Sequence, residues 1–146
     1  NVHAPLDELG RRVMQSAVDV LLLSAPDATL RDVTTVLGML PAAQRAAVPI
    51  EVLLGDPGAR AGKVLVCHGA YTNGGDAVAR ACFEHGIDTV IYIHIAPGDL
   101  ESLRRDKRGQ LIVTGHILGD AFGIEPYISA LRAQGIQVDV LSDILA

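Results

Sequence analysis

Three histidines in the second half of the chain each come directly after a short, mostly apolar run. The runs and their histidines are residues 64–67 with His68, residues 90–93 with His94, and residues 111–115 with His116. If the runs are parallel strands, their carboxyl ends share one edge of a sheet, outside which α/β proteins bind ligands. Imidazoles that meet there could ligate a metal ion or transfer protons near neutral pH. A histidine at a strand end is also common as a polar residue at the border of a core, and both interpretations stay open.

His116 is followed by a carboxylate four residues later, in the segment GHILGD (residues 115–120). Residues four apart lie on one face of a helix. If a helix begins within this segment, the His116 imidazole and the Asp120 carboxylate can reach the same metal ion, and both groups are common metal ligands.

A glycine-rich segment, GAYTNGG (residues 69–75), connects the first run to a predicted helix. Backbone amides in such loops can hold an anion such as phosphate, although the Lys-Ser/Thr pair of a P-loop does not follow here. The glycines fit a tight turn equally well, so this function also stays open. Cys67 and His68 would point to opposite faces of a strand, which argues against a nucleophile–base pair.

The elements that must position these groups alternate between strands and helices. We expect strands at residues 63–67, 89–95, 111–114 and 136–141, and helices at residues 76–85, 99–106 and 120–134. This βαβαβαβ order over residues 63–141 predicts a largely parallel sheet with helices on both faces. Residues 7–62 are predicted to be helical, with helices at 7–24, 29–40 and 41–47 and with Asp27 as a cap, before a short apolar run at 51–54.

Composition narrows the class of protein. A chain of 146 residues has the length of one domain. Its composition, 49% hydrophobic and 20% charged residues, excludes a disordered tail. The net charge of -5 disfavours nucleic-acid binding, and the apolar run at residues 20–23 is far too short for a membrane span. Two cysteines, Cys67 and Cys82, are too few for a disulfide framework. We interpret them as reduced core residues of a cytoplasmic protein.

The segment GHILGD, followed by Gly123 and Ile124, resembles the carboxyl-terminal signature of the NIF-three-like, or dinuclear-metal-centre, family. Its members are often described as homologues of GTP cyclohydrolase 1 type 2. The family's His and acid are metal ligands, which implies His116 and Asp120, although Glu is more usual at the second position. The segment HAPLD (residues 3–7) resembles the family's His-x-x-Leu-Asp motif, whose Asp bridges two metal ions, and this implies Asp7 as the third ligand.

The resemblance covers residues 1–7 and 63–141, and it implies that residues 1–146 form a single α/β domain, the carboxyl-terminal part of a longer, two-lobed chain. The adjacent His-His pair that completes the family's two metal sites does not occur here. By resemblance we expect two divalent ions (zinc, iron, manganese or cobalt) and a homo-oligomeric ring. We expect His94 and His68 to act in proton transfer, a role that the family pattern does not assign.

These expectations lead to three hypotheses. The first is a metal-dependent hydrolase of a small phosphorylated or nucleotide-like substrate, since paired divalent ions activate water and clamp phosphate or carbonyl oxygens. The alternative is a ring-forming scaffold or regulatory protein whose metal is structural. The third is an α/β domain that binds an anion at residues 69–75 without metal. With no Trp, two Phe and three Tyr, the chain has few groups for stacking a base.

Overall fold

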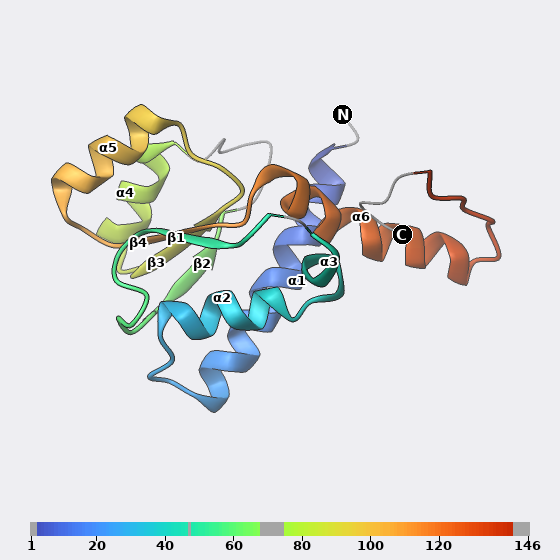
Figure 1. Cartoon of the computed structure of the whole chain (residues 1–146), viewed down its shortest axis with the longest axis horizontal. Helices are drawn as coiled ribbons and strands as arrows, with labels where there is room; N and C mark the ends of the chain where they lie inside the picture. The colour runs from blue at the N-terminus through green and yellow to red at the C-terminus, as the bar shows by residue number, and fades with distance from the viewer. Residues whose placement is uncertain (1–2, 47, 68–74, 142–146) are drawn as a thin grey trace.

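The computed structural model describes residues 3–46, 48–67 and 75–141, which form one sheet with helices packed against it (Figure 1). In chain order the elements are α1 (His3–Ser24), α2 (Leu30–Gly38), α3 (Pro41–Arg45), β1 (Glu51–Leu54), β2 (Val64–Val66), α4 (Asp76–Glu84), β3 (Thr89–Tyr92), α5 (Pro97–Asp106), β4 (Gln110–Val113) and α6 (His116–Ala133). In this part of the chain, no helix combines the length and apolarity that a membrane span requires.

The sheet is mixed, which corrects the prediction of a largely parallel sheet. Its strand order is β1-β4-β3-β2; β2, β3 and β4 are parallel, whereas β1 pairs with β4 in the antiparallel direction. The apolar run at residues 51–54 therefore forms an edge strand, and the prediction that residues 7–62 are helical is wrong at this point. The sequence shows that the run is apolar, but neither its partner nor its direction can be derived from that pattern.

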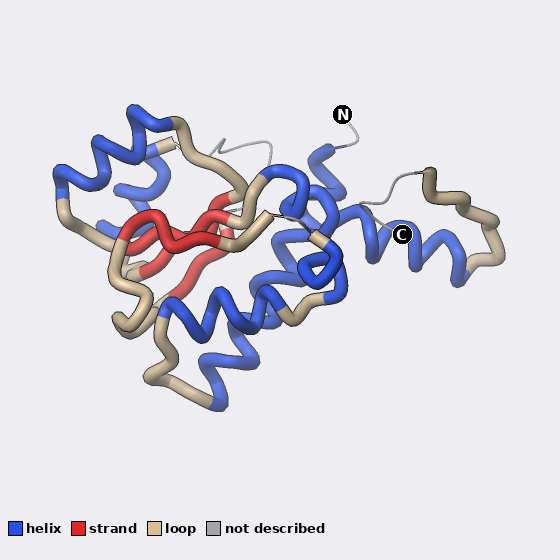
Figure 2. Tube along the Cα trace, in the orientation of Figure 1, coloured by secondary structure: helices blue, strands red, loops and turns tan. Residues whose placement is uncertain are grey.

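The expected strand at residues 136–141 is also wrong, because these residues lie in no strand or helix. They follow α6, whose second half extends away from the sheet (Figures 1 and 2). A strand is defined by hydrogen bonds to a neighbouring strand. Because α6 leads away from the sheet, residues 136–141 have no strand of the described chain beside them to pair with.

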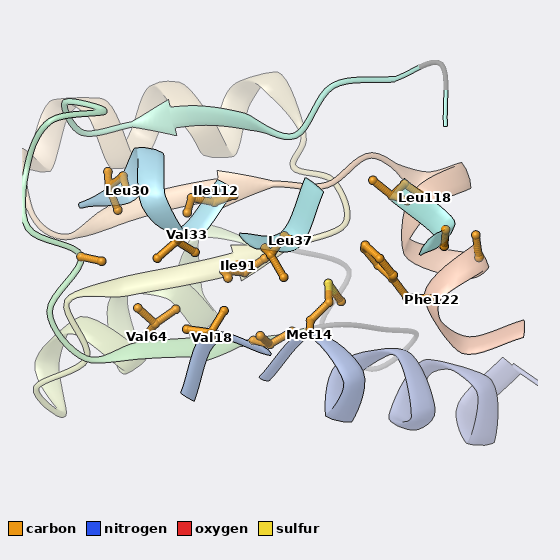
Figure 3. Packing of buried hydrophobic residues seen from close by; sticks show 14 residues of the cluster. Met14, Val18, Leu30, Val33, Leu37, Val64, Ile91, Ile112, Leu118 and Phe122 are labelled. Carbon is orange, nitrogen blue, oxygen red and sulfur yellow. The ribbon is translucent and has the colours of Figure 1, made fainter. Parts of the chain in front are cut away.

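The helices cover both faces of the sheet, as predicted. Successive residues of a strand point to opposite faces, so Ile91 on β3 packs in a cluster with α1, α2, α3 and α6, while its neighbours Val90 and Tyr92 pack toward α4 and α5. Figure 3 shows part of the larger cluster, where Met14 of α1 and Phe122 of α6 are fully buried.

The outer edge of β2 is covered by a side chain. Gln15 of α1 donates from Nε2 to the carbonyl oxygen of Val64 at 3.2 Å, and its Oε1 accepts from the N–H of Val66 at 2.9 Å. The Gln15 amide thus takes the place that the peptide group of a further strand would occupy. Exposed strand edges can pair with other chains, and this contact occupies the backbone groups of β2 at that point.

Candidate metal centre

His94 and His116 lie side by side at the carboxyl edge of the two central strands. His94 is two residues beyond β3 and His116 is the first residue of α6, after β4. The strands are parallel and in register, with Tyr92 opposite Val113. The two imidazole ring centroids are 5.4 Å apart, and the rings meet edge to face at 63°.

His116 and Asp120 lie one turn apart on the first part of α6. His116 Nε2 and Asp120 Oδ2 are 3.8 Å apart, which is too long for a hydrogen bond. The His116 side chain is 66% exposed and that of Asp120 is 36% exposed. The chain enters this helix through Gly115, whose φ of +84° is in the region that favours glycine.

Asp7 lies on the helix that packs against this face of α6. Gly123 is seven residues after His116 and three after Asp120, so the three positions share one face. A Cβ atom at Gly123 would overlap the carbonyl group of Leu6, and the absence of that atom lets the two helix backbones touch. Asp7, the next residue of α1, is only 8% exposed.

The structure does not gather the three predicted ligands into one cluster. Across residues 3–46, 48–67 and 75–141, no three side chains of His, Cys, Asp or Glu are placed to hold one metal ion. His116 and Asp120 are paired, His94 adjoins them, and Asp7 lies on the neighbouring helix. His68, the other residue expected to transfer protons, is outside the described residues.

One buried polar atom next to this pair is unsatisfied. His94 Nδ1 has no solvent exposure and no hydrogen-bond partner in the part of the chain that the structure describes. Buried polar groups nearly always have a partner, and leaving one without a partner costs free energy. A partner for His94 Nδ1 would therefore have to come from outside these residues.

Sequence reasoning missed the role of Gly123. The residue is part of the recognised motif, but its function as the contact between α1 and α6 is visible only in the fold. The sequence does contain a signal for this contact, namely a glycine inside a predicted helix, seven residues after a candidate ligand. Glycine is unfavourable inside a helix unless close packing requires it.

The fold and the site define an α/β protein with paired imidazole and carboxylate donors at one edge of its sheet. No protein-family model matches the chain, and a comparison with curated proteins finds no significant match. Among solved structures, the chain is similar to a NIF3 superfamily protein from Sphaerobacter thermophilus, with a TM-score of 0.85 and 48% sequence identity. The alignment covers 92% of this chain and 49% of that one, so the chain spans about half of that protein's length. This likeness in both sequence and fold supports the resemblance to NIF-three-like proteins.

Proposed function

We propose that the chain is part of a NIF-three-like protein that binds divalent metal ions, with Asp7, His116 and Asp120 as ligands. The observation that carries the proposal is the position of His116 and Asp120, one helical turn apart. They lie beside the imidazole of His94, whose Nδ1 has no partner among the described residues. Because this chain spans 49% of the similar protein, the remaining ligands are proposed to come from outside it.

The chemical types of the three proposed ligands fit the expected ions, and the described side chains alone do not complete a three-ligand cluster. Imidazole together with carboxylate suits zinc, iron, manganese or cobalt, whereas thiolates would favour a closed structural zinc site. Both side chains on α6 are accessible, and His94 Nδ1 has no hydrogen-bond partner among the described residues. When bound, a pair of such ions supplies Lewis-acid chemistry and activates water.

The activity that we propose is hydrolysis of a small phosphorylated or nucleotide-like substrate. Asp7, His116 and Asp120 would hold the metal, while His94 would hold or release a proton at the substrate's leaving group. An imidazole is suited to that task because its protonation changes near neutral pH. His68 remains a second proposed group for the same step.

Metal analysis of the full protein with single substitutions tests the binding site, because the remaining ligands are proposed to come from outside this chain. We expect His116→Ala and Asp7→Asn each to weaken manganese or zinc binding by about tenfold or more, since even the loss of a group that only orients a ligand costs about that much. Isothermal titration and elemental analysis after desalting measure this loss. His85→Ala and Asp19→Asn are matched controls, because both side chains are exposed, His85 at the end of α4 and Asp19 on α1, and neither is a proposed ligand. Unchanged binding by the folded His116→Ala chain would refute the site.

Turnover separates the proposed activity from its alternative. The metal-loaded full protein should hydrolyse at least one member of a panel of phosphoesters, and His116→Ala should abolish that activity. Binding of metal without turnover on any substrate would favour the alternative, a scaffold or regulatory protein whose metal is structural and which assembles into a ring.

A further inference from the structure

The two cysteines of the chain lie close together on the face of the sheet opposite to α1. Cys67 directly follows β2 and extends its pairing, since its N–H donates to the carbonyl oxygen of Ile91 at 2.9 Å. Cys82 lies on α4, which packs over that face. The two Sγ atoms are 3.9 Å apart, and both residues are half-buried, free thiols.

We propose that Cys67 and Cys82 form a reversible disulfide bond when the chain meets a low-molecular-weight disulfide. A disulfide requires an S–S distance of about 2.05 Å, so each sulfur has to move by about 1 Å. Rotation about the χ1 angles moves a cysteine sulfur that far without moving the backbone. The packing of α4 against β3, the neighbour of β2, already holds the two side chains in one cluster.

An oxidant can reach Cys82 from the surface. This residue lines a shallow apolar depression of about 460 Å³, together with residues that include Leu65, Val78 and Ile87. Burial, and the neighbouring Cys82, raise the pKa of the Cys67 thiol to about 12. Because Cys82 lines the depression, it is the residue that an oxidant reaches first.

The reaction balances with the disulfide as the oxidant. The Cys82 sulfur loses its proton to water and attacks one sulfur of R–S–S–R, whose S–S bond breaks to release the first R–S⁻. The Cys67 sulfur then loses its proton and attacks Cys82 Sγ, which breaks the mixed disulfide and releases the second R–S⁻. Both thiolates take up protons as RSH, so the two protein thiols are oxidised and the oxidant is reduced.

The bond would join the end of β2 directly to α4. It would close the loop formed by the intervening residues, which restricts the unfolded chain and thereby stabilises the folded one. The melting temperature of the oxidised chain should rise by about 5 °C or more. Thiols that only fill space in the core would give no such rise.

The test uses glutathione disulfide as the probe and mass spectrometry after alkylation under denaturing conditions as the readout. The folded chain should lose both alkylatable thiols and yield a peptide pair linked through Cys67 and Cys82, and dithiothreitol should reverse this. Cys67→Ser should stop at a mixed disulfide on Cys82, while Cys82→Ser should keep a free Cys67.

The equilibrium constant for oxidation gives a second measurement that does not depend on the variants. In a series of glutathione redox buffers, the folded chain should oxidise at least tenfold more favourably than the same chain in guanidinium chloride. An equal or smaller constant in the folded chain would overturn the proposal, because the fold would then not favour the bond. So would a disulfide that links two chains in dilute protein.

Discussion

Glu8, directly after Asp7 in α1, is held by two arginines. Arg11 donates from Nε and Nη2 to the Glu8 carboxylate at 2.7 and 2.8 Å, and Arg12 donates from Nε at 2.8 Å. These hydrogen bonds lower the pKa of Glu8 from 4.5 to about 2. A group whose pKa is lower in the folded state stabilises that state above its unfolded pKa and loses this contribution as the pH falls.

Replacing this carboxylate should therefore have a pH-dependent effect. We expect Glu8→Gln to lower the free energy of unfolding by about 0.5–1 kcal/mol at pH 7, the range for an exposed ion pair of good geometry. The difference from the unsubstituted chain should shrink as the pH falls from 4.5 toward 2, the two pKa values between which Glu8 titrates. Urea unfolding at pH 7, 5 and 3.5 measures it. Glu84→Gln, on the exposed end of α4, serves as the control, and a difference that stays constant with pH would contradict the assignment.

At the scale of elements, the contact between α1 and α6 determines how the candidate ligands are arranged. Gly123 allows the α6 backbone to lie against Leu6, and the same face of α6 carries His116 and Asp120. Alanine is preferred over glycine inside helices by about 1 kcal/mol. The glycine at this position is therefore explained by packing and not by helix propensity.

A pair of glycine substitutions tests this contact. Gly123→Ala should destabilise the chain by about 1–3 kcal/mol, because the new methyl group overlaps backbone and the helices must separate. Gly98→Ala in α5 is the control, since a Cβ atom there meets nothing within 4 Å; it should be neutral or slightly stabilising. Urea unfolding compares the two. Similar stability of both variants would show that α6 accommodates the methyl group without separating from α1.

Elements with strong local signals could be predicted from the sequence. The βαβ order from residue 63 onward predicted β2, β3 and β4 and the helices between them, because their apolar patterns and flanking turns are local. The cap of α2 was placed at Asp27 but lies at Thr29, which accepts from the N–H of Asp32 and in turn donates to the Asp32 carboxylate. The direction of β1 and the lack of a strand at residues 136–141 depend on partners that are distant in sequence.

Within the candidate site, too, some contacts follow from local sequence patterns and others depend on residues that are distant in the sequence. The proximity of His94 and His116 follows from strands that end at one edge, and that of His116 and Asp120 follows from helical spacing. The position of Asp7 depends instead on how α1 packs against α6, and no local pattern near residue 7 describes that contact. A ligand set that spans the chain therefore requires the fold before its geometry can be assessed.

At the scale of the whole molecule, two buried clusters on opposite faces of the sheet stabilise the fold, and the second half of α6 belongs to neither. The last buried residue of that helix is Gly123. Tyr127 in the helix and Ile136 beyond it are 48% exposed, and Leu141 is fully exposed. Segments with few buried contacts open more readily than core strands.

Hydrogen exchange should reveal this difference along the chain. Amides in peptides covering residues 127–141 should exchange at least tenfold faster than those of β3 and β4 in the same sample, because opening this segment exposes little apolar surface. Mass spectrometry of peptic fragments measures the rates. Equal protection of the two regions would indicate that the second half of α6 is covered in solution.

The contact between Gln15 and β2 also limits how the chain can be shortened. A fragment that begins after Gln15 would leave the N–H of Val66 and the carbonyl of Val64 open along a bare strand edge, next to the apolar surface that α1 covers. Such an edge is a template for strand addition by other molecules, and aggregation is its usual result. Protein engineering that trims the amino end should therefore keep Gln15, or replace its amide by another donor–acceptor pair of the same reach.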